Sequence, residues 1–249
     1  SAAAESTLPV SINNKTATVE LTAKNGDNVK NGKNIKIDIP QIQGADKYSL
    51  SIPAGTLSAP DGTGTIMIKS ELASITLQSN MLKGLAGADV KKIELSISKG
   101  DPSKLSAEAK AAIGNRPLIQ LNLMLDGKQH EWNNADSPVQ VSIPYSPTAE
   151  ELSHPESIVV WYIDGNGNLV SVPNGRYDPV SRAVTFETTH FSYFGAGYNH
   201  VAFKDIASDA WYRNAVDYIS ARKNAAGNGK GYYSPDSKLT RSQFIVMLM

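Results

Sequence analysis

The sequence predicts a mainly β protein: a β-sandwich region followed by a small α-helical repeat. Hydrophobic and polar residues alternate with a period of two through most of residues 8–194, which is typical of strands with one buried face. Turn-forming dipeptides rich in Asn, Asp and Gly separate these runs at the spacing of a sandwich, so we expect roughly a dozen strands. From residue 203 the period changes to three and four, which indicates helices.

The first hundred residues predict one β-rich layer, residues 1–100. Asn25-Gly26 and Asn31-Gly32 are favoured turn dipeptides, so we expect short antiparallel strands joined by hairpins around them. The alternating runs of this layer lie at residues 10–12, 17–21, 35–39, 48–52, 64–68, 75–77 and 91–97.

Residues 101–198 predict a β-sandwich unit that begins with a helix. Residues 106–113 are rich in helix formers, and Gly114-Asn115 follows them as a stop signal. The apolar run at 158–163 is expected to be the central strand. The predicted strands lie at residues 118–125, 139–143, 158–163, 168–172, 176–177 and 183–194. The pattern leaves open whether this unit and the first layer are one domain or two.

Residues 195–200 are expected to be a linker into an incomplete helical repeat, residues 199–249. Asp209 is placed to cap a first helix, whose apolar face we expect to include Trp211. Gly227, Gly229 and Gly231 then interrupt the pattern, as glycines in a loop do. Thr240, with Gln243 three residues later, has the spacing of a capping box at the start of a second helix.

This repeat resembles the S-layer homology repeat of bacterial surface proteins. The resemblance covers F-x-D-I, W-Y-x-x-A-V, G-x-G-x-G-Y-Y-S-P and L-T-R-S-Q-F between Phe203 and Phe244. It implies an extracellular location at the cell wall or S-layer, and binding of pyruvylated secondary cell-wall polysaccharide in grooves formed with further repeats of the full-length chain. Trp211 and Arg241 match the groove positions, whereas Ser242-Gln243 stands where the family often has Ala-Glu. With one repeat, we expect weak wall binding or none.

Residues 52–198 resemble a region that precedes such repeats in surface-anchored glycoside hydrolases of Paenibacillus-type bacteria. The resemblance rests on the runs S-I-P-Y-S-P-T-A-E-E-L, V-V-W-Y-I-D-G-N-G-N, V-P-N-G-R-Y-D-P and T-T-H-F-S-Y-F. It implies a stalk or spacer and no activity towards another molecule, so we expect any catalytic domain to lie outside this sequence.

Composition excludes several classes of function. The 24 basic residues balance the 24 acidic ones, which gives no electrostatic basis for nucleic-acid binding. Cysteine is absent, so disulfides and thiol chemistry are excluded. This absence is compatible with a secreted protein of a Gram-positive bacterium. No apolar run reaches the length of a membrane span. We therefore expect no nucleic-acid partner, no membrane span and no cofactor.

The sequence also predicts no metal site. Asp164-Gly-Asn-Gly-Asn168 begins like a calcium loop, but Gly175 stands at the position that needs a bidentate Glu, so we expect a hairpin turn. His130, His154 and His200 form no ligand-spaced pair. The adjacent Glu150 and Glu151 are expected to form a solvated face of a small helix.

One short motif points to chemistry within the chain itself. His190-Phe191-Ser192 near the end of the β region resembles the self-cleavage site of a nucleoporin and of GAIN domains of adhesion receptors. The resemblance implies that Ser192 Oγ attacks the Phe191 carbonyl carbon, that His190 takes the hydroxyl proton, and that water hydrolyses the resulting ester. The alternative is an ordinary last strand in which Ser192 is merely hydrogen-bonded.

A further alternative is a carbohydrate-binding module. Trp132, Trp161 and Tyr177 are its candidate stacking residues. Trp161 lies in an apolar run and is expected in the core, so Trp132 is the better candidate for an exposed platform.

Overall fold

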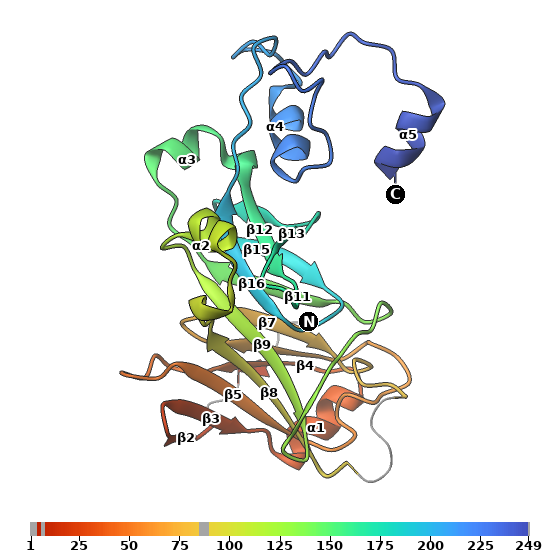
Figure 1. Ribbon diagram of the computed structural model, residues 1–249. Helices are drawn as coiled ribbons and strands as arrows, with labels where there is room; N and C mark the ends of the chain where they lie inside the picture. The colour runs from red at the N-terminus through yellow and green to blue at the C-terminus, as the bar shows by residue number, and fades with distance from the viewer. Residues whose placement is uncertain (1–3, 6–7, 85–89, 249) are drawn as a thin grey trace.

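The computed structural model describes residues 4–5, 8–84 and 90–248 and is mainly β, as predicted (Figure 1). Parts of the predicted ranges 1–100 and 199–249, namely residues 1–3, 6–7, 85–89 and 249, lie outside the described residues. Two sheets pack over one hydrophobic core, to which both contribute, for example Leu77 and Val141 from one sheet and Leu50 and Leu123 from the other. The fold is therefore the predicted sandwich.

Within the described residues the first sheet has seven strands and the second has nine. The seven-stranded sheet has the order β1 (Ala4–Glu5), β4 (Asn34–Asp38), β6 (Thr65–Lys69), β7 (Ser74–Gln78), β11 (Val139–Pro144), β15 (Ala183–Thr188) and β14 (Arg176–Asp178). The nine-stranded sheet has the order β13 (Leu169–Ser171), β12 (Ile158–Ile163), β16 (Tyr193–Tyr198), β9 (Leu118–Leu125), β8 (Lys92–Lys99), β5 (Lys47–Pro53), β3 (Thr16–Glu20) and β2 (Val10–Asn13), with β10 (Lys128–His130) paired to β9.

Short helices connect the strands and form the C-terminal repeat. They are α1 (Ala23–Lys30), α2 (Ala107–Ile113), α3 (Ala149–Ser153), α4 (Arg213–Ala221) and α5 (Arg241–Leu248), with 3-10 turns η1 (Pro102–Lys104) and η2 (Pro155–Ser157). As Figure 1 shows, α4 and α5 lie beyond the end of the sandwich that carries α3.

The hairpin predicted at Asn25-Gly26 is wrong, because these residues lie inside α1. Thr22 caps this helix by accepting a hydrogen bond from the Asn25 amide at 3.3 Å. The helix connects β3 of one sheet to β4 of the other. As a result β3 pairs in parallel with β5, and β4 in parallel with β6, which a tight hairpin does not permit.

Each sheet joins a block of strands from before residue 100 to a block of strands from after it. β8 pairs with β9 in the nine-stranded sheet, where Ile97 lies opposite Leu121. β7 pairs with β11 in the seven-stranded sheet, where Ile75 lies opposite Val141. The division into units at residue 100 stays a prediction, which thermal unfolding of the chain can test.

The prediction that residues 158–163 form the central strand is wrong. This strand, β12, is second from an edge of its sheet and lies between β13 and β16. It is nevertheless buried on both faces. Val159 and Trp161 turn away from the main core into a second cluster that includes Ala109 and Ile113 of α2. The strand is uniformly apolar because a helix covers its outer face.

The predicted continuous strand 183–194 and the predicted linker 195–200 both differ from the structure. The first sheet's β15 ends at Thr188, the chain crosses between the sheets, and β16 begins at Tyr193. Most of the expected linker is then the buried second half of β16. Gly197 fits there because a Cβ at this position would collide with the indole of Trp161.

Candidate functional site

The first helix of the C-terminal repeat begins later than expected. α4 starts at Arg213, and its N-cap residue Tyr212 makes no side-chain capping hydrogen bond, so the predicted cap at Asp209 is wrong. The buried face of α4 carries Val216, Asp217 and Ser220. Trp211 precedes the helix and is not part of that face.

The second helix begins as predicted. The Gln243 amide donates to Thr240 Oγ1 at 3.2 Å, and the Thr240 amide donates to Gln243 Oε1 at 2.9 Å, which completes the capping box. The loop before α5 is held by Asp205, whose carboxylate accepts hydrogen bonds from the amides of Tyr233 and Ser234 at 2.8 and 2.7 Å.

The two residues expected to contact polysaccharide are both open to solvent. Trp211 is 92% exposed, and Arg241 is exposed as the first residue of α5. A hollow of about 810 Å³ lies between the glycine-rich loop and the start of α5, and Arg241 is not among its lining residues. It is lined by residues 225–228, 233–235, 237–239, 242 and 243. Polysaccharide binding by Trp211 and Arg241 stays a prediction.

Arg222, at the end of α4, joins the repeat to the sandwich. It is 1% exposed, and its guanidinium donates to the backbone carbonyls of Gly175, Glu156 and Ile158. The guanidinium also lies 3.5 Å from the centre of the Tyr218 ring. Five fixed donors suit Arg to this role, because one side chain can satisfy several carbonyls at once.

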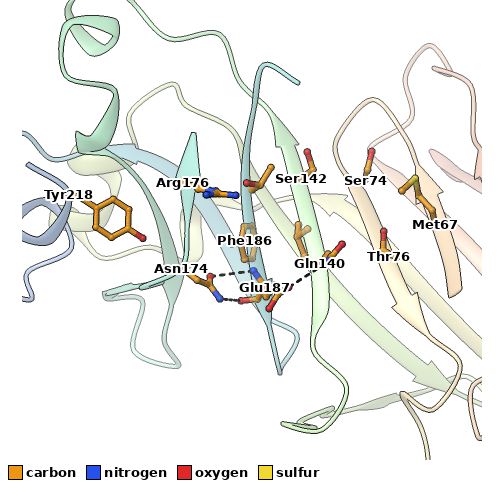
Figure 2. Close-up of a pocket in the computed structure, with 12 residues that line it drawn as sticks. Met67, Ser74, Thr76, Gln140, Ser142, Asn174, Arg176, Phe186, Glu187 and Tyr218 are labelled. Carbon is orange, nitrogen blue, oxygen red and sulfur yellow. Dashed lines mark hydrogen bonds between the residues drawn. The ribbon is translucent and has the colours of Figure 1, made fainter. Parts of the chain in front are cut away.

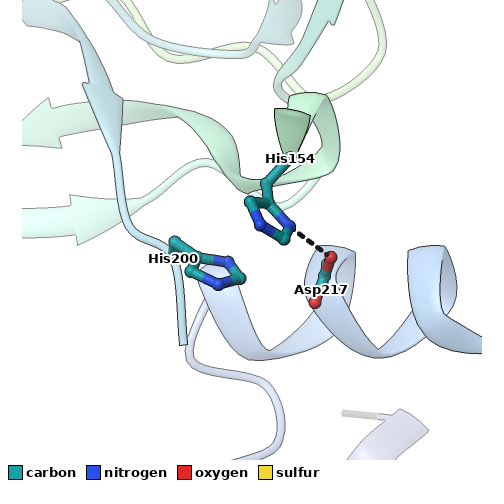
Figure 3. Close-up of side chains that lie close together, drawn as sticks. All are labelled: His154, His200 and Asp217. Atoms are coloured by element: carbon teal, nitrogen blue, oxygen red, sulfur yellow. Dashed lines mark hydrogen bonds and ion pairs between the residues drawn. The ribbon is translucent and has the colours of Figure 1, made fainter. Parts of the chain in front are cut away.

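A polar cluster lies beside this joint (Figure 3). His154 follows α3, His200 follows β16, and Asp217 lies on α4. His154 Nδ1 is 3.3 Å from Asp217 Oδ2, and the two imidazole rings stack with their centres 3.8 Å apart. Burial lowers the pKa of His200, and the neighbouring His154 lowers it further.

Arg213 also belongs to this cluster. Its Nη2 lies 3.3 and 3.4 Å from the two ring nitrogens of His154, and its Nε lies 3.8 Å from Asp217 Oδ2. Sequence reasoning missed the whole group because His154 and Asp217 are 63 residues apart in the chain. Arg222 was missed for the same reason, since no local pattern marks a buried arginine.

The three residues of the predicted self-cleavage motif each contact a different neighbour. Ser192 Oγ donates to the Ile163 carbonyl at 3.1 Å. The His190 ring packs against Tyr162 at 4.7 Å between centres, and burial lowers the pKa of His190. Phe191 packs against Trp132 at 4.7 Å between ring centres. The neutral imidazole suits a base, but its nitrogens are not bonded to the serine.

The expectation of an exposed Trp132 is wrong. Trp132 is 2% exposed, and its indole nitrogen donates to the Met81 carbonyl at 3.0 Å. Trp161 is buried, as expected, and Tyr177 is half-buried with its ring 6.2 Å from that of Tyr145. The indoles of Trp132 and Trp161 are therefore core residues with no face for a sugar.

The outer face of the seven-stranded sheet does carry a hollow, of about 580 Å³ (Figure 2). Gln140 donates to Glu187 Oε1 at 3.3 Å within it, and Asn174 donates to the Glu187 carbonyl at 3.2 Å. Tyr218 of α4 closes one side. The lining residues are Met67, Ser74, Thr76, Gln140, Val141, Ser142, Asn174, Arg176, Thr185, Phe186, Glu187 and Tyr218.

The prediction that Glu150 and Glu151 both face solvent is wrong for Glu151. This carboxylate is 2% exposed and accepts hydrogen bonds from Arg116 Nη2 at 2.7 Å and from Tyr145 at 2.8 Å. It also closes a capping box with Thr148. Asp164, in contrast, forms the expected hairpin turn by accepting from the amides of Asn166 and Asn168.

Comparison with known proteins bears on the repeat and on the whole chain. The S-layer homology domain family model matches residues 202–245. The chain is also 25% identical over 243 residues to an amylopullulanase of Thermoanaerobacterium thermosulfurigenes. That match covers 95% of this chain but only 12% of the relative.

Among the described residues, no helix is both long enough and apolar enough to cross a membrane. The repeat itself indicates the location of the chain. The helix, the glycine-rich loop and the capped second helix coincide with the matched family model. Residues 202–245 are therefore an S-layer homology domain, and the chain belongs outside the cell at the cell wall.

Proposed function

We propose that this chain anchors a larger protein to pyruvylated secondary cell-wall polysaccharide through its S-layer homology domain. The observation that carries the proposal is the exposure of Trp211, at 92%, in the same matched domain as the exposed Arg241. A pyruvyl group presents a carboxylate, which a guanidinium binds with two parallel hydrogen bonds. An exposed indole offers an apolar surface with a polar edge for a sugar ring.

Further repeats of the full-length chain complete this binding unit. Large apolar side chains are exposed in this domain at Leu239 (59%), Phe244 (55%) and Ile245 (56%). Such a group of apolar residues on one small domain is typical of a surface that packs against a partner. Neighbouring repeats supply that partner, because each repeat is too small to bury its own helices fully.

The sandwich acts as a spacer that holds the domain in a fixed orientation. Arg222 ties α4 to three carbonyls of the sandwich, and Tyr218 donates to the Pro173 carbonyl at 2.8 Å. Asn199 donates to the Ala221 carbonyl at 2.6 Å. The 25% identical amylopullulanase favours an enzyme over an adhesin as the anchored protein.

Sedimentation of the full-length protein with purified wall polymer tests the proposal. Arg241→Ala and Trp211→Ala are each expected to weaken binding at least about tenfold, and removal of pyruvyl groups is expected to abolish the effect of Arg241. Lys128→Ala and Val180→Ala are the controls, since both residues are exposed on the sandwich. Binding that neither Arg241→Ala nor Trp211→Ala changes would contradict the assigned residues.

A carbohydrate-binding module is the second candidate function. Because Trp132 and Trp161 are buried, its candidate site is the hollow of Figure 2. The amides of Gln140 and Asn174, the exposed Arg176 and the Glu187 carboxylate offer planar hydrogen-bonding groups of the kind that fix sugar hydroxyls. A glycan array tests it. Binding to a soluble glycan that Arg176→Ala reduces and Lys128→Ala does not would support the module, and silence on the array would dispose of it.

A further inference from the structure

We propose that His154, His200 and Asp217 form a binding site for a divalent transition-metal ion of the zinc class. The donor atoms of these residues all lie within 4.8 Å of one another. They come from three places, the end of α3, the end of β16 and the buried face of α4 (Figure 3). An ion held here ties the S-layer homology domain to the sandwich.

The distance between the first two donors suits tetrahedral coordination. Zinc bonds to nitrogen and oxygen of roughly 2.0–2.1 Å place neighbouring ligand atoms about 3.3 Å apart. His154 Nδ1 and Asp217 Oδ2 are 3.3 Å apart. The third donor lies within 4.8 Å of the other two, so a side-chain rotation that separates the stacked His154 and His200 rings brings all three donors to one ion.

The surroundings also suit a metal ligand. His200 Nδ1 lies 3.2 Å from the hydroxyl of the buried Ser157, which leaves Nε2 of that ring for an ion. Ligating histidines usually use their other ring nitrogen in this way, which fixes the orientation of the ring. Asp217 has a side chain only 8% exposed, so an ion there would neutralise a carboxylate that is costly to bury.

The donor set selects the class of ion. Two imidazoles and one carboxylate form a common zinc site with a fourth position for water, whereas calcium and magnesium prefer oxygen ligands alone. The site joins two parts of the chain, so the role we assign to the ion is structural.

Arg213 competes with the ion. Its guanidinium lies beside both ring nitrogens of His154, and a positive charge there opposes the approach of a cation. The same side chain donates to the Ser208 carbonyl at 3.0 Å and is 29% exposed, so it can turn outwards when an ion enters. Removing this charge should therefore strengthen metal binding.

Calorimetric titration of the whole chain with Zn²⁺, after treatment with a chelator, tests the site. One ion per chain is expected, together with a higher melting temperature. His154→Asn and His200→Gln should each weaken binding at least about tenfold, and Arg213→Gln should strengthen it several-fold. His130→Gln, a histidine outside the cluster, is the matched control and should bind as the parent does.

Two further measurements keep the test decisive. Co²⁺ bound in the site should give the intense visible absorption of tetrahedral coordination, and Mg²⁺ should give no thermal shift. Circular dichroism of each variant shows whether it is folded. If His154→Asn does not fold, the test rests on His200→Gln alone. Three results would overturn the proposal. The first is a dissociation constant for Zn²⁺ above about 1 mM, and the second is unchanged Zn²⁺ binding by folded His200→Gln. The third is weaker Zn²⁺ binding by Arg213→Gln than by the parent.

Discussion

Arg222 brings a positive charge into the interface between α4 and the sandwich, where its partners are backbone carbonyls and the Tyr218 ring. Burial disfavours the charged form and lowers the pKa of Arg222, yet guanidinium stays charged in proteins. The cost of burying this charge is offset because the carbonyls would otherwise be buried without a donor. The interface therefore depends on the shape of the guanidinium and not only on its charge.

Replacing this side chain should loosen the domain from the sandwich. Arg222→Ala leaves the carbonyls of Gly175 and Ile158 without their donor, and we expect a loss on the order of 3 kcal/mol in the free energy of unfolding. Arg222→Lys should lose nearly as much, because an ammonium group lacks the planar fork. Urea unfolding measures the loss, and faster proteolysis in residues 223–231 should accompany it.

The control for this prediction is Lys238→Ala, which removes an exposed cation from the same domain. Its stability should stay within about 0.5 kcal/mol of the parent. If Arg222→Lys were as stable as the parent, charge alone would hold the interface and our reasoning about shape would be wrong.

Self-cleavage of the peptide bond between Phe191 and Ser192 stays a prediction. For it to occur, the Ser192 hydroxyl has to leave the Ile163 carbonyl, 3.1 Å away, and reach the Phe191 carbonyl carbon. Cleavage gives two fragments on a denaturing gel, the second beginning at Ser192, and Ser192→Ala restores one band. Intact mass after long incubation at neutral pH is the measurement, and a single full-length mass there contradicts the prediction.

At the scale of elements, α3 depends on one buried carboxylate. Burial raises the pKa of Glu151, but hydrogen bonds from the Thr148 amide, Tyr145 and Arg116 outweigh burial, so the pKa lies below its ordinary value. The same arrangement raises the pKa of Tyr145 to about 12, mainly through burial. Glu151 thus fixes the start of α3 and connects this helix to Arg116 beyond α2.

Acid should weaken this connection. Because the folded pKa of Glu151 is depressed, its stabilisation is fully present above the ordinary Glu value of 4.5 and is lost as the pH falls through the lower folded value. Glu151→Gln should therefore lower stability on the order of 2 kcal/mol at pH 7, and the difference from the parent should shrink towards pH 3. Urea unfolding across this range is the measurement.

The neighbouring Glu150 offers a matched control, since it is exposed where Glu151 is buried. Glu150→Gln should change stability little at any pH in the range. A difference between Glu151→Gln and the parent that stays constant down to pH 3 would show that the carboxylate's charge is not what stabilises α3.

Elements with local signals could be predicted from the sequence, and pairings could not. The capping box of Thr240 and Gln243, the stop at Gly114 and the hairpin turn that begins at Asp164 each depend on a few adjacent residues. Asn25-Gly26 failed because the same dipeptide fits a helix once Thr22 caps it. The cluster of His154, His200 and Asp217 depends on how distant strands and helices pack, which no local pattern encodes.

At the scale of the whole molecule, the chain passes repeatedly between the two sheets. β3 and β5 belong to the nine-stranded sheet, whereas β4, which lies between them in sequence, belongs to the seven-stranded sheet. Both sheets also join strands from before and after residue 100. Neither half of the β region has a sheet of its own, so separating the halves would expose strand edges in both sheets.

We therefore predict that residues 8–198 unfold in one cooperative transition. Ile97→Ala on β8 and Leu121→Ala on β9 remove buried side chains that face each other across residue 100, and each should cost about 2–5 kcal/mol. Both variants should lower the midpoint temperature of the same calorimetric transition. The calorimetric and van 't Hoff enthalpies of that transition should be equal. The control Val180→Ala changes an exposed residue and should leave the midpoint unchanged. Two separate transitions, one moved by each variant, would instead show that the sandwich consists of two domains that meet at residue 100.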